Sequence, residues 1–577
     1  MIHYHTGISY LSKTLFGMFL KKSDLLLLIT VFFLMFAPKS NAQIVTNQGR
    51  DFWVVFPCHL PTDLANLGQL RLYITSRSDS KGVYMIGSNV YPFTVSGNSI
   101  YVSPNIDRNL AYLANTGSYS QKGIHVVIDS DQPEVVVYAH LFANARSAAT
   151  LVFPTTIIGS QYYVMGYDQN TTPTSTGSGK FVYTILATQP NTTVLIHPRV
   201  NNISQGGTPT KITLANAGDV YQFLGDTDYT GTYIEIDPST PSKTFAVFSG
   251  SSGTVIPIDC GVKSYDPLFQ QLYPINLWGK EYGYVPFNGP DGGDFIRVIA
   301  QEDNTAVNIA GISITLNKGQ FYTTPNPVTT EEIISSDKLI SVAQIALSQY
   351  CASTDHGSTS DTESDPDMVI LNPIKNKTQD ATTYSSIQEH IDNEFINVII
   401  STAAASSFKV NGSPPMSSPS FRQLGTSQYS YMQLDLAPYN TSVPKKSISI
   451  RLTADDGFNA IVYGFGAFES YAYSAGISQP DICSDPDLPA IIIPNVFTPN
   501  GDELNDIWAI KNISYYPQSV VHIFNRWGSL IYSSSDGYQH PWDGTFNGIN
   551  LPVATYYYVI DLHNCKPLYA GYVAIIR

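Results

Sequence analysis

The segments Phe181-Val-Tyr-Thr-Ile185, Phe295-Ile-Arg-Val-Ile299 and Phe395-Ile-Asn-Val-Ile399 repeat one apolar pattern along the chain. A weaker copy, Arg71-Leu-Tyr-Ile74, precedes them. Eight or nine residues after the last isoleucine of each copy comes a second apolar segment, anchored at Val83, Val194, Val307 and Phe408. Tyr, Phe, Val, Ile and Thr favour half-buried β-strands. The pattern therefore predicts four related units built from β-strands.

Each unit also contains, further on, two strand-like segments separated by Asp, Ser, Pro or Gly, which reverse the chain. These paired segments span residues 126–138, 234–248, 333–343 and 451–463. A repeat of about 100–115 residues is too long for a solenoid and suits an antiparallel sandwich of about seven strands. We predict an all-β fold of tandem antiparallel, Ig-like β-sandwiches at 43–168, 169–285, 286–385 and 386–478.

A third phrase is shared by two of the junctions between units. It places a glycine five residues after a proline and a tyrosine three residues later, as in Pro154, Gly159, Tyr162 and in Pro274, Gly279, Tyr282. Just before the second copy, the segment Asp266-Pro267-Leu-Phe-Gln-Gln-Leu272 combines an N-cap residue, a proline and an apolar pair. This combination predicts a short helix.

The composition limits the classes of function. Only 13% of the residues are charged, the formal net charge is −15, and the chain has 38 Tyr and 27 Phe. A nucleic-acid-binding protein would need a basic face, so no nucleic-acid partner is expected. The motifs HExxH and GxSxG are absent, and neither an enzymatic activity nor a cofactor is expected. A secreted, carbohydrate-active hydrolase stays open as an alternative, because the separation of two catalytic carboxylates is spatial.

The N-terminus has the features of a signal peptide. Lys21 and Lys22 precede the apolar run at 25–38, and small residues stand at Ser40 and Ala42. The run is shorter than the ~20 residues of a membrane span. We predict a signal peptide at 1–42, with translation starting at Met1 or Met18.

The five cysteines lie far apart in the sequence. They include no CxxC pair, so a zinc site is not expected. An oxidising compartment permits long-range disulfides. The candidate pairs are Cys260 with Cys351 and Cys483 with Cys565, which leaves Cys58 free or paired with another chain.

Several phrases of the repeat region resemble the N-terminal domain of IgGFc-binding proteins. They are Phe245-Ala-Val-Phe-Ser-Gly250-Ser-Ser-Gly, Cys260, and Leu272-Tyr-Pro-Ile-Asn-Leu-Trp-Gly279-Lys-Glu-Tyr282. The resemblance covers residues from about 50 to about 380, extending toward 475. It implies extracellular binding or adhesion through the β units, with an extracellular macromolecule or surface as the partner.

A linker at 479–490 precedes a last domain at 491–577, predicted to be a small β-sandwich. Its ordered motifs comprise Pro494, Phe497, Thr498, Pro499, Asn500, Gly501, Asp502, Asn505, Asp506, Asn525, Arg526, Trp527, Gly528, Trp542, Asp543, Gly544, Thr545, Tyr556, Tyr557 and Tyr558. They resemble the gliding-motility-associated C-terminal domain, the type B sorting domain of the type IX secretion system in Bacteroidetes. Glu503 and Ala554 depart from the pattern, which usually has glycine there. The resemblance implies export by the type IX machinery to the cell surface or beyond it.

Within this domain, Trp527 and Trp542 are predicted to fill the core. Asn500, Asp502, Asn505 and Asp506 are clustered oxygen donors of the kind that bind calcium. However, Lys511 stands where an EF-hand needs its bidentate glutamate, which favours an Asx-turn network. No metal site is therefore predicted.

A second acidic run lies near Cys351 and comprises Asp361, Glu363, Asp365 and Asp367. Side chains alternate across a strand, so on a strand these four would share one face and repel each other unless a cation were bound. A solvated loop is the favoured prediction.

Together these features predict a secreted cell-surface binding or adhesion protein whose tyrosine-rich faces contact another macromolecule. A structural surface or matrix component is the remaining alternative.

Overall fold

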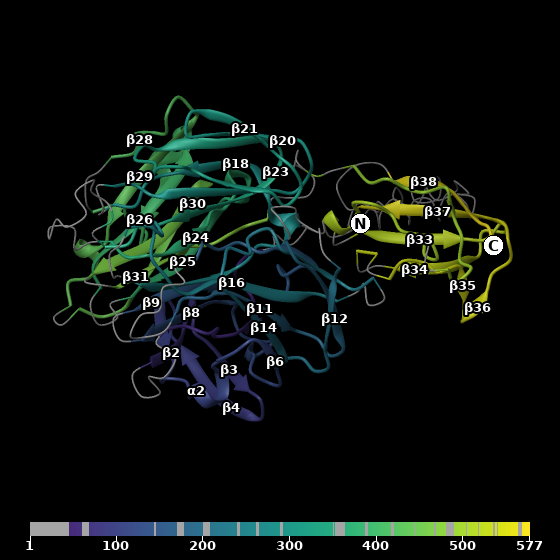
Figure 1. Ribbon diagram of the computed structural model, residues 1–577, viewed down its shortest axis with the longest axis horizontal. Coiled ribbons are helices and arrows are strands. Elements are labelled where there is room, and N and C mark those ends of the chain that lie inside the picture. Colours follow the sequence, from purple (N-terminus) through teal and green to yellow (C-terminus); the bar gives the residue numbers. More distant parts are fainter. Residues whose placement is uncertain are drawn as a thin grey trace, which may run out of the picture. The chain divides into compact units, whose positions relative to one another are not determined.

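The computed structural model in Figure 1 describes residues 46–60, 68–143, 146–169, 178–199, 208–238, 243–260, 265–288, 292–349, 351, 364–386, 391–416, 420–442, 445–466, 469–479, 488, 490–502, 505–516, 519–534, 537–538, 540–562 and 568–577. The predicted signal peptide, Cys483, Cys565, Asp361 and Glu363 lie outside these residues. No helix among the described residues is long and apolar enough to cross a membrane.

The first unit contains two four-stranded antiparallel sheets, ordered β1-β7-β3-β4 and β5-β2-β8-β9. Its strands are β1 (Asp51–Val54), β2 (Gly68–Ser76), β3 (Ser80–Ile86), β4 (Asn89–Val95), β5 (Ser99–Val102), β7 (Ile124–Ile128), β8 (Val135–Ala143) and β9 (Ser147–Val152). A one-turn helix, α2 (Arg108–Ala111), and β6 (Gly117–Tyr119) lie between β5 and β7. β6 leaves its own unit and pairs with β14 of the next one.

The second unit repeats this plan. One sheet is ordered β10-β15-β12-β13, and the other is β17-β16-β11-β14 extended by β6. The strands are β10 (Gln161–Tyr163), β11 (Phe181–Ala187), β12 (Thr192–His197), β13 (Thr210–Leu214), β14 (Val220–Gly225), β15 (Tyr233–Ile236), β16 (Phe245–Thr254) and β17 (Asp266–Gln271). The short helix expected over Asp266–Leu272 is wrong. The segment is strand β17, because it pairs with β16 and every one of its residues is buried, so tertiary packing overrides the local helix signals.

The third unit follows the 3-10 turn η1 (Ile275–Leu277). It contains β18 (Gly279–Tyr284), β19 (Phe295–Ala300), β20 (Thr305–Ile309), β21 (Ile312–Leu316), β22 (Phe321–Thr323), β23 (Glu332–Ile345) and β24 (Met368–Ile370). The fourth contains η2 (Ile374–Asn376), β25 (Thr378–Ser385), β26 (Ile391–Ser401), η3 (Thr402–Ser407), β27 (Lys409–Val410), β28 (Arg422–Gln423), β29 (Tyr429–Asp435), η4 (Ala437–Tyr439), β30 (Ile448–Gly466) and β31 (Glu469–Ser474).

The long strands β23 and β30 distinguish these two units from the first two. The first part of β23 pairs with β18 and β20, and its last part pairs with β19 and β24. One strand therefore joins both halves of the unit where the sequence predicted a strand, a turn and a strand. In β30 the corresponding bend contains Gly457, whose φ of +79° suits glycine. The all-β prediction of tandem antiparallel sandwiches is confirmed.

Strand pairing also shows where each unit begins. β10 pairs with β15, β18 with β23, and β25 with β30. Each of these strands lies before a predicted boundary, at 168/169, 285/286 or 385/386, but pairs with a strand that lies after that boundary. Since the Pro-x4-Gly phrase comes directly before or at the start of β10 and β18, the phrase marks the beginning of a unit.

The junction glycines pack directly on the prolines of the next junction. A Cβ on Gly49 would clash with Pro154, one on Gly159 with Pro274, and one on Gly279 with Pro373. Only a residue without a side chain permits this approach of backbone to ring. The shared phrase is thus a packing contact that recurs between successive units.

The last strands of the four units meet in a closed cycle, with β9 contacting β17, β17 contacting β24, β24 contacting β31, and β31 contacting β9. All residues of these strands are buried. The Gln270 Nε2 of β17 donates to the carbonyl oxygens of Ala149 in β9 and Ala472 in β31, at 3.0 Å each, and so links β17 to its neighbour β9 and, across the cycle, to β31. The cycle is also tied at its ends, because the Asn47 N–H donates to the Ile477 carbonyl at 3.1 Å. The four units therefore form a ring around a buried centre.

The C-terminal domain, yellow in Figure 1, contains a five-stranded sheet ordered β32-β38-β37-β33-β34 and a β35-β36 hairpin. Its elements are β32 (Val496–Phe497), η5 (Ile513–Tyr515), β33 (Val520–Phe524), β34 (Leu530–Ser534), β35 (Thr545–Phe546), β36 (Ile549–Asn550), β37 (Thr555–Asp561) and β38 (Tyr569–Ile575). Trp508 and Trp542 are fully buried in its core.

Candidate binding site

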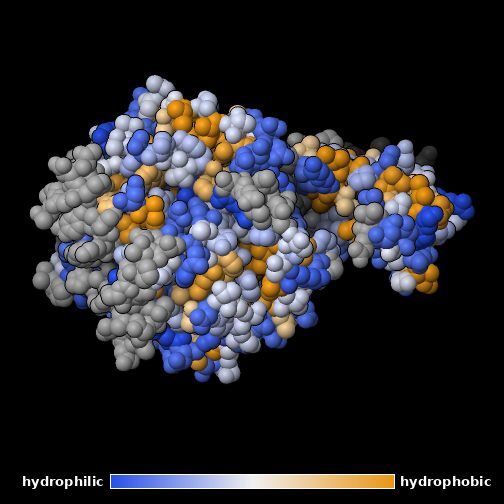
Figure 2. Space-filling view, viewed as in Figure 1, coloured by the Kyte–Doolittle hydropathy of each residue, from blue (hydrophilic) through white to orange (hydrophobic). Residues whose placement is uncertain are grey.

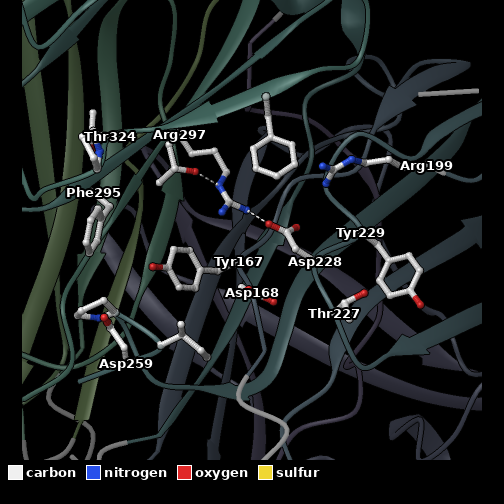
Figure 3. Close-up of a pocket in the computed structure, with 15 residues that line it drawn as sticks. Tyr167, Asp168, Arg199, Thr227, Asp228, Tyr229, Asp259, Phe295, Arg297 and Thr324 are labelled. Carbon is white, nitrogen blue, oxygen red and sulfur yellow. Dashed lines mark hydrogen bonds and ion pairs between the residues drawn. The ribbon is translucent and has the colours of Figure 1, made fainter. Parts of the chain in front are cut away.

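A pocket of about 960 Å³ opens between the second and third units (Figure 3). We call it the interunit pocket. Its lining comes from the segments that follow β10, β12, β14 and β16 in the second unit, and from β19, β22 and the residues after β22 in the third: Tyr167, Asp168, Arg199, Thr227, Asp228, Tyr229, Pro257, Ile258, Asp259, Phe295, Arg297, Phe321, Thr323, Thr324 and Pro325. The volume falls in the range of small-ligand sites.

Arg297 lies at the base of this pocket and is 4% exposed. Its Nη1 donates to the Asp228 Oδ2 at 2.7 Å, to the Thr230 Oγ1 at 3.0 Å and to the Gly166 carbonyl. Its Nε donates to the Thr323 Oγ1 at 2.8 Å. A buried guanidinium needs such a set of acceptors, because an unpaired buried charge is very costly. Arg297 therefore fixes the second unit against the third.

The repeat makes this arginine stand out. In the aligned strand pattern, Arg297 occupies the position of Tyr183 in the second unit and Asn397 in the fourth. Asn397 also reaches the preceding unit, where its Nδ2 donates to the Val285 carbonyl at 3.0 Å. In the third and fourth units the side chain at this position thus bridges neighbouring units. Of the three residues, only Arg297 carries a charge.

Aromatic rings and guanidiniums alternate along one wall. The guanidinium carbon of Arg297 lies 5.0 Å from the ring centre of Tyr167 and 4.5 Å from that of Phe321. That of Arg199 lies 4.4 Å from the ring centre of Phe321. Burial raises the pKa of the Tyr167 hydroxyl to about 12, against the opposing effect of Arg297, so Tyr167 stays neutral. Such cation–π contacts stiffen the wall.

Carboxylates face this wall from loops of the second unit (Figure 3). Asp228 is held in place, because its Oδ1 accepts from the Thr230 N–H at 2.9 Å and its Oδ2 accepts from Arg297. Asp168 and Asp259 are exposed. The pocket therefore offers hydrogen-bond donors, acceptors and aromatic faces together.

Sequence reasoning missed this pocket. Its residues come from separate segments of two units, and sequence shows no spacing among them. One signal was available: an arginine in the middle of a strand pattern whose other members are buried, because arginine is almost never fully buried without a partner.

A second group of charges lies at the centre of the ring, with one residue from each unit. Arg146, Asp266 and Asp365 stand eight residues before the prolines that open the next units, and Glu469 begins β31. Asp266, Asp365 and Glu469 are at most 1% exposed. We call these four residues the central tetrad.

Burial raises the pKa of Asp266 well above its ordinary value, and the neighbouring Asp365 and Glu469 add to this, whereas Arg146 lowers it. Burial raises the pKa of Asp365 and of Asp367 in the same way. The solvated loop predicted for the 361–367 run is therefore wrong for Asp365 and Asp367, which the packing of β24 against β17 and β31 carries into the core. No group of three metal-ligating side chains in metal-binding geometry occurs among the described residues.

The motif residues of the C-terminal domain divide into turn, core and surface positions. The Asp506 Oδ1 accepts from the Asn500 N–H at 2.8 Å and from the Gly501 N–H at 2.7 Å, and the Asn500 Oδ1 accepts from the Asp502 N–H at 3.1 Å. The Thr498 N–H donates to the Asn505 carbonyl at 2.9 Å. Asn500, Asp502 and Asp506 thus form an Asx-turn network, beside which Asn505 contributes its backbone carbonyl.

The core positions surround Trp542, which is 1% exposed and lies 5.3 Å from Phe497 and 5.2 Å from Tyr556 between ring centres. Further motif residues support this core through turns. The Trp508 Nε1 donates to the Pro494 carbonyl, the Thr545 N–H donates to the Asp543 Oδ1, and Gly544 packs on Pro499. The motif therefore stabilises this fold.

Trp527 behaves differently. It was predicted to fill the core, and that prediction is wrong: its side chain is 73% exposed. Trp527 lies in the turn between β33 and β34, where the Asn525 Oδ1 accepts from the N–H groups of Trp527 and Ser529, with Gly528 at a φ of +79°. The Arg526 guanidinium stacks on the Trp527 ring at 4.1 Å. The tight turn holds the ring outside the core.

An exposed apolar row crosses the sheet next to this turn. Phe524 is paired with Leu530 on one side and with Tyr557 on the other, and Tyr557 is paired with Tyr572. Directly opposed residues in antiparallel strands share a face. Tyr557 is 51% exposed and Tyr572 56%. Apolar surface is visible on this domain in Figure 2. We call these residues and Trp527 the aromatic row.

Cys260 and Cys351, one of the two candidate pairs, form a disulfide that joins the second and third units. Cys58, which belongs to neither candidate pair, is a buried free thiol. Burial raises its pKa, so the thiol is protonated and unreactive at neutral pH.

The fold and its sites define a multi-unit β-sandwich protein with a ligand-sized pocket and a separate C-terminal β domain. The family model for the IgGFc binding protein matches residues 148–464, more than half of the chain, and the chain belongs to this family. The CHU_C Type IX secretion signal domain matches residues 491–575. Both resemblances read from the sequence are confirmed.

Other comparisons add little. No curated protein matches the chain. Among solved structures, a biofilm associated protein BSP domain is 7% identical, with the match covering 92% of this chain and 96% of that chain at a TM-score of 0.13. Salmonella alpha-2-macroglobulin reacted with methylamine is 8% identical, with coverage of 92% and 40% and a TM-score of 0.11. Scores this low support no argument about the fold.

Proposed function

We propose that this chain is a surface adhesion protein, exported by the type IX machinery, whose ring of β units binds an extracellular ligand. One observation carries the proposal: a body of the IgGFc binding family and a type IX secretion signal domain occur in the same chain. The signal domain makes the chain secreted cargo. The body supplies the binding function outside the cell.

The interunit pocket supports binding rather than catalysis. Asp228, its most enclosed carboxylate, is held by Arg297 and by a backbone N–H, which leaves it poorly placed to abstract a proton. A fixed ion pair on a stiff wall suits recognition, because a preorganised site loses little entropy when a ligand binds.

The aromatic row supports recognition of the C-terminal domain by the export machinery. Contiguous exposed apolar side chains on a soluble domain mark interaction sites. Tyr and Trp provide large contact areas, and an arginine stacked on a tryptophan is typical of interface centres. Since Trp527 contributes little to the core, a contact with another protein explains its exposure.

The export part of the proposal is tested by removing residues 491–577 from the chromosomal gene. The truncated protein should accumulate in the periplasm, whereas the full chain should reach the medium or the cell exterior. Fractionation followed by immunodetection measures both. Normal surface display of the truncated protein would overturn the assignment.

The binding part is tested with the full chain in its own cells. Cells that carry the gene should attach to glycan-, protein- or mineral-coated surfaces more strongly than cells that lack it, and the purified protein should compete. If purified protein hydrolyses a polysaccharide and supports no attachment, the secreted hydrolase becomes the better explanation. If the protein neither hydrolyses a polysaccharide nor supports attachment, but deletion of the gene changes the cell envelope, a structural role becomes the better explanation.

A further inference from the structure

We infer that the interunit pocket is a subsite for a neutral saccharide unit, an inference that rests on the proposed binding function and names its ligand class. The starting observation is the balance of charge. Arg297 and Asp228 form a close ion pair at 2.7 Å and neutralise each other. Among the other described lining residues, one guanidinium, Arg199, faces two exposed carboxylates, Asp168 and Asp259.

This balance disfavours an acidic ligand. A phosphate, sulfate or sugar acid in the pocket would add negative charge where carboxylates already exceed guanidiniums. Electrostatic complementarity selects against such a partner, because like charges brought together cost several kcal/mol. A ligand without net charge avoids this cost.

The polar groups also match hydroxyls. Asp168 and Asp259 accept hydrogen bonds, Arg199 donates them, and the Thr227 side chain can do both. A sugar hydroxyl is both a donor and an acceptor, so adjacent hydroxyls on a ring can use groups of both kinds at once. A simple anion or cation uses only one kind.

The walls complete the match. Tyr229 and Phe321 line the same pocket as the carboxylates, and both are only partly buried. The C–H face of a sugar ring is apolar and packs against such aromatic surfaces, while its hydroxyls point to polar groups at the rim. Binding sites that combine apolar walls with a few placed polar groups are the usual form of small-ligand sites.

The test compares purified residues 43–577 with the variants Asp168→Asn and Asp259→Asn on an array of neutral oligosaccharides, acidic oligosaccharides and basic peptides. Both carboxylates are exposed, so each variant should fold normally. Asp131→Asn, the same change at an exposed aspartate of the first unit outside the pocket lining, is the matched control. Titration of the best array ligand then gives the dissociation constants.

We expect the wild type and the control to bind a neutral oligosaccharide, and each pocket variant to bind it at least tenfold more weakly. Selective binding of acidic glycans or of basic peptides would overturn the inference. So would neutral-glycan binding that both pocket variants retain, although the proposed adhesive function would then stand. If the cells attach but the purified protein binds no glycan, the saccharide inference fails and the adhesive function stands. If the cells also fail to attach, the proposed adhesive function fails too.

Discussion

Replacing Asp294 with asparagine should change how the stability of this protein depends on pH. Asp294 is 0% exposed in the third unit. Its Oδ2 accepts from the Tyr284 hydroxyl at 3.1 Å, the Phe287 N–H at 2.9 Å and the Gln344 Nε2 at 2.8 Å. Its Oδ1 has no hydrogen-bond partner among the residues that the structure describes. Burial raises the pKa of this carboxyl from 3.8 to about 7, although the three donors oppose the shift.

The direction of the effect follows from where the proton is held. In the unfolded chain Asp294 releases its proton near pH 4, whereas in the folded protein it holds the proton until about pH 7. Between these values the unfolded state alone gains from deprotonation, so the free energy of unfolding falls as the pH rises. At about 1.4 kcal/mol per pKa unit, the loss is about 4 kcal/mol across this window.

An asparagine has the same shape and does not titrate. Its Oδ1 can accept from the three donors, while its amide nitrogen takes the unpartnered position, at a cost of about 1–3 kcal/mol that does not vary with pH. Relative to the wild type, Asp294→Asn should therefore be destabilised at pH 4 and gain about 4 kcal/mol by pH 8.

Urea denaturation at pH 4, 6 and 8 measures this difference at constant ionic strength, with Asp131→Asn as an exposed control. The control should follow the wild type at every pH. Parallel curves for Asp294→Asn and the wild type would refute the reasoning, because they would mean that the buried carboxyl titrates as it does in the unfolded chain.

Three further changes test other parts of the structure. Gly279→Ala should lower the free energy of unfolding by about 1–3 kcal/mol, because its Cβ clashes with Pro373; an unchanged urea midpoint would contradict the tight junction. Replacing Cys260 and Cys351 together by serine opens a disulfide with a sequence separation of 91, which should cost about 4–5 kcal/mol; wild-type stability would count against it. Trp527→Ser should leave the C-terminal domain folded, by circular dichroism, yet reduce surface display, measured by external protease; full display would exclude this ring from recognition.

The fold was largely predictable because repetition multiplies weak signals. A single strand such as Phe295–Ile299 is ambiguous, but several copies at similar spacing, each followed by a second apolar anchor, predict a strand-based unit. Local rules failed where packing opposed them. The Asp-Pro signal at Asp266 is typical of a helix start, yet the buried edge of β16 recruits that segment into a sheet. The polar residues within β23 predicted a turn and instead form a bend.

The sites were less predictable, since they depend on contacts between units. Nothing in the local sequence of Arg199 indicates that it lies beside Arg297 on the ring of Phe321. In the C-terminal domain, the motif residues could be assigned to a family but not sorted into core and surface. Trp527 and Trp542 have the same chemistry, and only the turn set by Asn525 places one of them outside.

The central tetrad shows why the first unit belongs to the same structure as the rest. The family match begins at residue 148, just after Arg146. Yet Arg146 is the cation that lowers the raised pKa of Asp266 and of Asp365, which come from the second and third units. Without the first unit, those carboxyls would lose the compensating charge of Arg146, and β17 and β31 would lose β9 as their neighbour. Buried charges are tolerated only when paired. The ring therefore closes as a set of four units, even though only part of it carries the family pattern.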